Sequence, residues 1–240
     1  MGVSKKIVFS ALASVLPFML LAAAPVQDRG TWGPGAERIE KAVQVVEELA
    51  NLPKSEQRLP DWILPKAQGL AVFPGVVKAA YGIGGQYGRG ILMVKNEAGE
   101  WSDPVFASLI GGSIGWQIGV EKSDIVLVFK SRKTIEFISS GKLTLGADAS
   151  IAAGPVGRQA EAATDLQMEA EIYSYSKSKG LFAGISVKGA SIQVDRDADS
   201  AFYGRSDISP YDIFSGEKIK APAVVGRLKA TLAKYSATLK

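Results

Sequence analysis

Two glycine-rich segments constrain the fold of this chain more than any other feature. Within residues 80–94 the glycines other than Gly85 fall at alternating positions with large side chains on the other face, and a similar arrangement recurs in residues 111–120. The glycines on one face are Gly82, Gly84, Gly88 and Gly90 in the first segment and Gly111, Gly115 and Gly119 in the second. Because alternate residues of a strand point to opposite faces, the pattern predicts two strands with one bare face, where another backbone can approach closely.

A phosphate-binding loop is the competing interpretation of the first segment. The register of a dinucleotide-binding motif that starts at Gly82 requires glycine where the chain has Tyr87. The Gly141-Lys142 pair continues with Leu143 instead of Ser or Thr, so the chain has no P-loop motif. Such a loop also needs a helix behind it, whereas the strand pattern continues through Met93. We therefore assign these glycines to the fold.

The remaining periodicity predicts helices at both ends of a β-rich centre. Helices are expected at 36–52, 131–140, 210–215 and 224–235, and strands at 125–129, 143–152, 166–173 and 181–194. Strands and helices do not alternate regularly, which argues against a doubly wound parallel sheet. The predicted fold class is α+β, with a glycine-rich, mostly antiparallel β core that is sandwich- or barrel-like and is flanked by N- and C-terminal amphipathic helices.

The first 24 residues have the pattern of a signal peptide. Lys5 and Lys6 precede an apolar run over 7–21, and three alanines follow at 22–24. We expect 1–24 to be a signal peptide, 25–35 a flexible lead-in and 36–240 a single domain that is exported to the periplasm. Without residues 1–24, Lys and Arg fall from 28 to 26 against 24 acidic residues, so the net charge falls from +4 to +2. So small a charge predicts no nucleic-acid partner.

The composition excludes most enzyme chemistry, because the chain has no His and no Cys. Ser-His-Asp and Cys-His nucleophiles cannot be built, nor can zinc sites that use imidazole or thiolate. Ser174 and Lys177 match an S-x-x-K motif, but the motif needs a helix and these residues end a predicted strand. The acidic residues Asp148, Glu161, Asp165, Glu169 and Glu171 are interpreted as a solvated strand face. We predict no catalytic residue, no metal site and no cofactor.

Basic residues at predicted strand ends and turns are the candidate ligand-binding groups. They are Lys130, Arg132, Lys133, Arg158, Lys177 and Lys179. If these ends converge, the side chains would form charge-assisted hydrogen bonds to a lipid headgroup. Charge that serves only solubility is the alternative.

The predicted first helix carries an apolar stripe of Ile39, Val43, Val46 and Leu49. The stripe either packs on the domain or contacts a membrane or a partner. The opposite face mixes acidic and basic residues, which weakens the membrane interpretation.

From about Leu64 to Leu232 the chain resembles the SYLF domain family of lipid-binding modules. The matching stretches are residues 66–70, 111–119, 145–150, 153–158, 173–184, 202–204 and 209–213. The resemblance implies a non-enzymatic module that binds membrane lipid, with phosphoinositides as ligands in eukaryotic members and actin binding in the yeast branch. In animal members an N-terminal amphipathic helix is linked to lipid contact, and 36–52 occupies the similar position.

The predicted signal peptide changes the expected ligand, because an exported protein meets neither cytoplasmic phosphoinositides nor actin. We therefore expect a peripherally membrane-associated module at the cell envelope that binds anionic phospholipid. The alternative is a structural or protein-interaction module with an envelope protein as its partner.

Overall fold

Two long antiparallel strands form the centre of the fold: β1 (Gly69–Val94) and β2 (Val105–Phe129). They pair from Leu92 opposite Val105 to Gly69 opposite Phe129, in the computed structural model of the chain. The structure describes residues 33–53, 58–156, 169–178, 187–216 and 219–237, with backbone alone at 80–83, 113–118 and 140. All of them belong to one compact unit, Trp32–Lys240.

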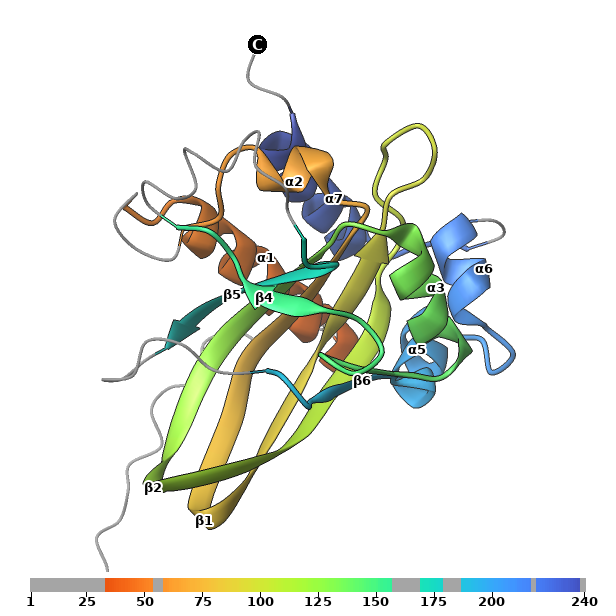
Figure 1. Ribbon diagram of the computed structural model, residues 1–240. Coiled ribbons are helices and arrows are strands. Elements are labelled where there is room, and N and C mark those ends of the chain that lie inside the picture. The colour runs from red at the N-terminus through yellow and green to blue at the C-terminus, as the bar shows by residue number, and fades with distance from the viewer. Residues whose placement is uncertain (1–32, 54–57, 157–168, 179–186, 217–218, 238–240) are drawn as a thin grey trace, which may run out of the picture. The chain divides into compact units, whose positions relative to one another are not determined.

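β1 folds back on itself near its middle, where the register with β2 shifts between Ala80 and Gly82. Its two halves meet closely: a side-chain carbon added at Gly90 would lie 2.1 Å from the carbonyl oxygen of Val72, and one at Gly88 would lie 2.5 Å from Val76. The close approach predicted for these two glycines is confirmed. Figure 1 shows the folded end of the strand pair at the bottom of the view.

Four short strands extend the sheet from the outer edge of β2. β6 (Ser191–Val194) pairs with residues 107–110 of β2, and β5 (Ile172–Ser178) pairs with residues 123–129. β3 (Lys142–Thr144) continues from β6, and β4 (Ile151–Ala153) lies parallel to β5. All the other pairings between these strands are antiparallel, so the predicted mostly antiparallel core is confirmed.

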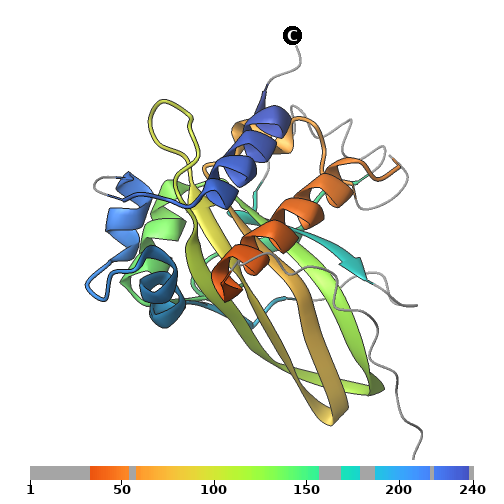
Figure 2. The same cartoon turned by 180° about the vertical axis from the view of Figure 1, so that it is seen from behind.

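Helices cover the sheet on two faces (Figures 1 and 2). α1 (Pro34–Ala50) and α7 (Ala223–Ser236) lie side by side on one face, which we call the α1 face. α3 (Arg132–Ser140) packs on the opposite face, which we call the α3 face. The short helices are α2 (Ile63–Lys66), α5 (Arg196–Tyr203) and α6 (Pro210–Ser215). The predicted α+β class with flanking helices is confirmed.

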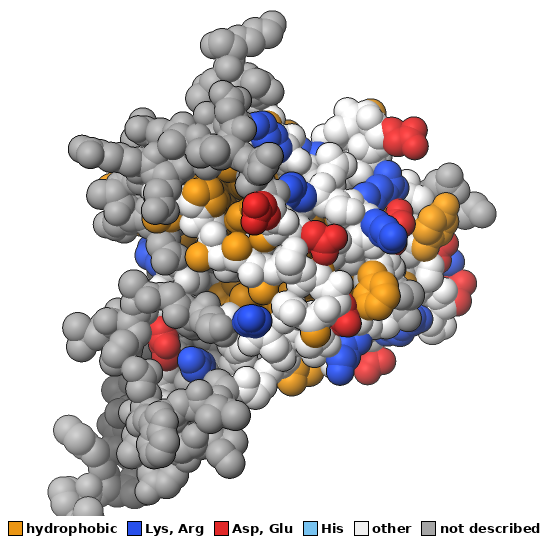
Figure 3. All heavy atoms as spheres, in the orientation of Figure 1, with side chains coloured by type: hydrophobic (Ala, Val, Ile, Leu, Met, Phe, Trp, Pro, Cys, Tyr) orange, Lys and Arg blue, Asp and Glu red, His pale blue; other side chains and the backbone are white. Residues whose placement is uncertain are grey.

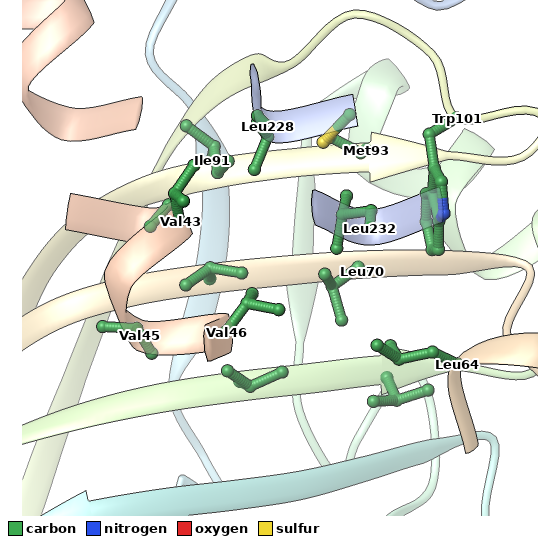
Figure 4. Packing of buried hydrophobic residues seen from close by; sticks show 14 of the residues in the cluster. Val43, Val45, Val46, Leu64, Leu70, Ile91, Met93, Trp101, Leu228 and Leu232 are labelled. Carbon is green, nitrogen blue, oxygen red and sulfur yellow. The ribbon is translucent and has the colours of Figure 1, made fainter. Parts of the chain in front are cut away.

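Each face of the sheet has its own hydrophobic core. On the α1 face, even-numbered residues of the first half of β1, such as Leu70 and Val72, meet the apolar stripe of α1. Figure 4 shows Val43 and Val46 pointing at these strands, with Leu228 of α7 beside them. On the α3 face the odd-numbered neighbours pack against α3. Both faces of the central strands are therefore buried in this part of the sheet.

The structure differs from the sequence predictions in several places. The strand expected over 166–173 begins only at Ile172 and continues to Ser178, and residues 166–168 lie outside the described residues. Of the strand expected over 181–194, residues 191–194 are β6 and residues 188–189 form a turn, while 181–186 lie outside the described residues. The strand expected over 143–152 is two short strands, because residues 145–149 form a turn with Gly146 at φ 84°. The segment 125–129 is the end of β2 and not a separate strand. Gly119 has open space where a side chain would lie, so close approach does not explain this glycine.

Candidate functional site

The basic residues Lys130, Arg132 and Lys133 lie where β2 ends and α3 begins. Lys130 follows the buried Phe129, and its backbone N–H donates to the carbonyl oxygen of Glu171 at 3.0 Å. All three basic side chains are exposed. The sequence therefore placed this group correctly at a surface turn next to a strand end.

α3 has one buried and one exposed stripe. Thr134, Ile135 and Ile138 are buried. Lys133 and Phe137 lie one helical turn apart on the exposed stripe, and 52% of the Phe137 surface is exposed to solvent. The helix therefore presents a cation and a large aromatic ring to the same side.

A pocket between α3 and α6 extends this surface. Arg132, Glu136 and Tyr211 line its polar side, and Ile135 and Phe214 are among its apolar residues. Tyr211 is 77% exposed. Figure 3 shows hydrophobic and charged side chains close together over α3 and α6. We call Lys130, Arg132, Lys133, Phe137 and Tyr211 the α3 rim.

The local sequence explains how α6 presents Tyr211. Ser209 and Asp212 form a capping box: the Ser209 hydroxyl accepts from the Asp212 N–H at 3.2 Å, and the Asp212 carboxylate accepts from the Ser209 N–H at 3.0 Å. The hydrogen bonds from Ser209 lower the pKa of Asp212. Pro210 and Ile213 are buried, so Tyr211 projects outward from a fixed helical turn.

The ion pair that Arg132 of the α3 rim forms with Glu136 contributes little to stability. Arg132 forms an ion pair with Glu136 at 3.6 Å, and the two side chains are 45% and 68% exposed. Ion pairs this exposed contribute at most about 1 kcal/mol, so an anionic ligand can compete for Arg132. α3 also begins without a side-chain cap and without an acidic residue in its first turn, which favours an anion near that end.

Lys177 does not join this group. It lies opposite Asp124 on the β2–β5 ladder, whereas Ile172 lies opposite Phe129 next to Lys130. At about 3.3 Å per residue, the five strand positions from 124 to 129 separate Lys177 from the α3 rim by more than about 15 Å. Lys177 instead forms an ion pair with Glu48 of α1 at 2.8 Å.

Arg158 and Lys179 fall outside the described residues. The six basic residues considered from the sequence therefore divide into three at the α3 rim, one that is paired with α1 and two without a description. Strand ends that look equivalent in sequence lie at opposite ends of one ladder, and a sequence pattern alone does not give that ladder's direction.

The apolar stripe of α1 is part of the core. Ile39, Val43, Val46 and Leu49 are fully buried against the sheet and α7. In this conformation the four side chains are not accessible to a membrane or to a partner. The sequence left packing and membrane contact open, and the structure has the packed arrangement.

The S-x-x-K residues do not form a catalytic pair. The Ser174 hydroxyl donates to the carbonyl oxygen of Ala152 at 3.2 Å, while Lys177 pairs with Glu48. Both belong to β5, where positions three apart point to opposite faces. Among the described residues, no group of three or more His, Cys, Asp or Glu is placed to hold a metal ion. No helix in the described ranges is long and apolar enough to cross a membrane.

Sequence reasoning missed two buried carboxylates, Asp103, which pairs with Lys229, and Asp199 of α5. Asp199 is the more deeply buried of the two. Its Oδ1 accepts from the N–H of Phe106 at 2.8 Å, and its Oδ2 lacks a hydrogen-bond partner. Burial raises the pKa of Asp199 to about 7. The Arg38–Asp195 ion pair, at 3.2 Å, links α1 to the residue that caps α5. The spacing of Asp195 and Asp199, one helical turn apart, was the only available sequence signal.

Lys95 is a buried cation with a structural explanation. Its ammonium donates to the carbonyl oxygens of Leu64 at 2.7 Å and Pro65 at 3.1 Å, and it lies over the Trp101 ring. Desolvation lowers the pKa of Lys95. These contacts tie the end of β1 to α2, so we assign the lysine to the fold and not to a site.

The described residues form an α+β domain with an exposed basic and aromatic surface, and no catalytic centre is recognisable among them. A family described as "Ysc84: Las17-binding protein actin regulator" matches residues 110–235, which is just over half of the chain. The chain belongs to this Ysc84 (SYLF) family.

Relatives support the same assignment. The chain is 37% identical over 183 residues to an SH3 domain-containing YSC84-like protein 1 from Xenopus laevis, covering 74% of this chain and 54% of the relative. It is 38% identical over 171 residues to Protein YSC84 of Saccharomyces cerevisiae, covering 70% and 36%. The chain thus spans about half or less of the length of these relatives. No solved structure matches the chain.

One further relative is named as a binding protein. Another yeast relative, LAS seventeen-binding protein 3, is 36% identical over 173 residues, covering 71% of this chain and 37% of its own length. None of these three relatives is named as an enzyme.

Proposed function

We propose that this domain is a non-enzymatic binding module that associates with anionic membrane lipid through the α3 rim. The observation that carries the proposal is the combination of three exposed cations with two exposed aromatic rings, Phe137 and Tyr211. A basic residue near an anionic membrane surface contributes about 1 kcal/mol of binding free energy. Aromatic side chains favour the membrane–water interface, so the two kinds of residue act together.

The proposal places the domain at the cell envelope. Residues 1–24 have the sequence pattern of a signal peptide, which supports export to the periplasm and peripheral association with a membrane there. The ligand that we propose for this location is bacterial anionic phospholipid, and no cofactor is involved.

Co-sedimentation with vesicles tests the α3 rim. We compare the full chain with Lys130→Gln/Arg132→Gln/Lys133→Gln and with a charge-matched control, Lys66→Gln/Lys188→Gln/Lys220→Gln, whose lysines are also exposed. Both variants lower the net charge from +4 to +1. Any contribution from residues 1–24 is common to all three proteins, so the difference between the variants reports on the rim.

We expect the rim variant to pellet less than the control with vesicles of phosphatidylglycerol and phosphatidylcholine. Binding should weaken as salt rises above about 150 mM, where charges are screened beyond about 8 Å. Equal pelleting of the two variants would contradict the proposal. So would a wild-type protein that pellets equally with vesicles of phosphatidylcholine alone and with vesicles that contain phosphatidylglycerol.

A protein partner is the second candidate, and the comparisons favour it. The matching family is described as a Las17-binding actin regulator, and a yeast relative is named as a LAS seventeen-binding protein. For this chain an envelope protein is the corresponding partner. Cross-linking in cells should then recover the same protein with the wild type and with the rim variant, and loss of that protein in the rim variant would argue against this candidate.

A further inference from the structure

The part of the sheet near the fold of β1 and β2 exposes four large hydrophobic side chains. Val77 is 43% exposed, Tyr87 45%, Ile110 43% and Val120 78%. Tyr87 lies directly opposite Ile110, and Val120 lies opposite Ala79, two positions from Val77. We call Val77, Tyr87, Ile110 and Val120 the tip patch.

The tip patch lies on the α1 face, beyond the edge of the helical cover. Ile91 of β1 and Phe106 of β2 belong to this face and are buried in the α1 core. Tyr87 and Ile110 are four positions further along the same strands, and so have the same orientation. A polar groove that Gln44 of α1 lines marks where the cover ends. Figure 2 shows α1 and α7 crossing the upper part of the sheet, with the folded strands extending below them.

Two basic side chains lie directly beside the patch residues on the strands. Arg89 and Lys122 are exposed and alternate with patch residues along β1 and β2. The Arg89 Nε donates to the Tyr87 hydroxyl at 2.8 Å, which holds the guanidinium at the edge of the ring. Tyr87 therefore presents an apolar ring with a polar, cationic end, as aromatic residues do at a membrane interface.

The nearest carboxylates on β2 already accept hydrogen bonds within the protein. Asp124 accepts from the backbone N–H of Gly75 at 2.7 Å, and Glu121 accepts from the Ser178 hydroxyl at 2.8 Å. These carboxylates remain charged, and Glu48 and Asp124 line the groove beside Lys122. The two cations, Arg89 and Lys122, are each two strand positions from a patch residue and so are the charges directly next to the hydrophobic side chains on the strands. Charge complementarity points to an anionic surface as its occupant.

We propose that the tip patch is a second lipid-contacting surface, which seats its hydrophobic side chains in a bilayer with Arg89 and Lys122 at the level of anionic headgroups. A second copy of the chain fits less well, because a two-fold contact would bring the same two cations against themselves. The inference rests on the proposed function for the class of ligand and adds a separate site for it.

The two surfaces are on opposite faces of the sheet. α3 packs on the α3 face, and the tip patch belongs to the α1 face. A flat bilayer therefore contacts one of them at a time. This separation allows each surface to be tested while the other is intact.

Site-specific labelling tests the tip patch directly, because the chain has no cysteine. Val120→Cys and a control, Ala233→Cys, each carry one environment-sensitive nitrobenzoxadiazole label. Ala233 is exposed on α7, on the same side of the sheet but in a groove beside Trp101, away from the patch. We expect phosphatidylglycerol-containing vesicles to blue-shift and brighten the label at position 120 and to leave position 233 unchanged.

The α3 rim variant separates the two proposals. Label insertion at position 120 should persist when Lys130, Arg132 and Lys133 are replaced by Gln. Pelleting of the protein without a change at position 120 would overturn the tip patch and leave the α3 rim in place. Equal changes at positions 233 and 120 would also overturn it, and an absence of pelleting would overturn both surfaces.

A charge placed in the patch gives an independent readout. Ile110→Glu/Val120→Glu should fold as the wild type does, because both positions are exposed, and circular dichroism checks this. We expect the variant to lose at least about tenfold in affinity for the vesicles, since burying one carboxylate at a bilayer costs more than about 1.4 kcal/mol. Unchanged affinity in a folded variant would contradict the inference.

Discussion

The two halves of the β1–β2 pair have similar strand structure and opposite environments. Away from the fold, Val72 and Ile91 are fully buried under helices, whereas Val77 and Tyr87, nearer the fold, are more than 40% exposed. The 26 residues of β1 span about 85 Å, or about 40 Å for each half, whereas the 17 residues of α1 span about 25 Å. The strands are longer than the helix that covers them, so one sheet supplies both a core and an exposed surface.

Replacing a glycine where the halves of β1 meet should have the largest effect. In Gly90→Val the new side chain would lie 2.1 Å from the backbone oxygen of Val72, which cannot move aside without breaking the sheet. We expect a loss of more than about 4 kcal/mol of unfolding free energy, or no folded protein. Gly112→Ala is the control, because that position has open space, and its stability should stay within about 1 kcal/mol of the wild type. Denaturant titration measures the unfolding free energy of both variants. Similar losses in the two variants would show that close backbone approach does not explain Gly90.

Truncation of one buried and one exposed aliphatic residue compares the two regions. Leu49→Ala removes a fully buried side chain from the α1 core and should cost about 2–5 kcal/mol. Val120→Ala in the tip patch should change stability by less than about 0.5 kcal/mol, since the side chain is 78% exposed. Thermal unfolding of the two variants gives the difference. A large loss at Val120 would mean that the patch is covered in solution.

The folding stability of the covered region should depend on pH through the buried carboxyl of Asp199. Asp199 binds its proton more tightly in the folded state, with a pKa of about 7, than in the unfolded state. Between about pH 4 and pH 7 the folded state therefore binds more protons, and stability falls as the pH rises. Asp199→Asn keeps an oxygen for the Phe106 N–H and removes this slope. We expect it to be more stable than the wild type at pH 8, by a few kcal/mol at most, and equal slopes would contradict the assignment.

The ion pair at the border between the regions should matter least. Glu48 and Lys177 are 50% and 35% exposed, and such pairs contribute from zero to about 1 kcal/mol. A double-mutant cycle with Glu48→Gln and Lys177→Gln measures the coupling. A coupling well above 1 kcal/mol would show that this pair helps to hold α1 on the sheet.

Local patterns in the sequence predicted most of the elements. The helix over 36–52, the Ser209-Pro210 start of α6 and the strand character of both glycine segments are all present. The capping box and the alternation act within a few residues, so they are visible without tertiary contacts. α5 was missed, because it is short and its caps, Asp195 and Gly204, stand in a run of charged residues.

The candidate surfaces depend on information that a linear pattern lacks. The sequence identified the basic residues of the α3 rim but not Phe137 or Tyr211, whose exposure results from which side of each helix packs. It placed Lys177 with the rim, although the antiparallel ladder carries it to the other end of β5. The tip patch was not found, because alternation predicts which residues share a face and not where a covering helix stops.

The geometry of the β1–β2 pair also sets an order of assembly. Paired residues are separated by 13 positions at Leu92–Val105, next to the connecting loop, and by 60 at Gly69–Phe129. Closing the shortest loop first costs the least chain entropy, and each later pair extends a hairpin that already exists. We expect Leu92→Ala to slow folding more than Leu127→Ala, an equally buried leucine on the same face, whereas Leu127→Ala should mainly accelerate unfolding. In this order, β1 and β2 pair first, the strand pair then bends at its glycines, and α1 and α7 pack on the sheet last.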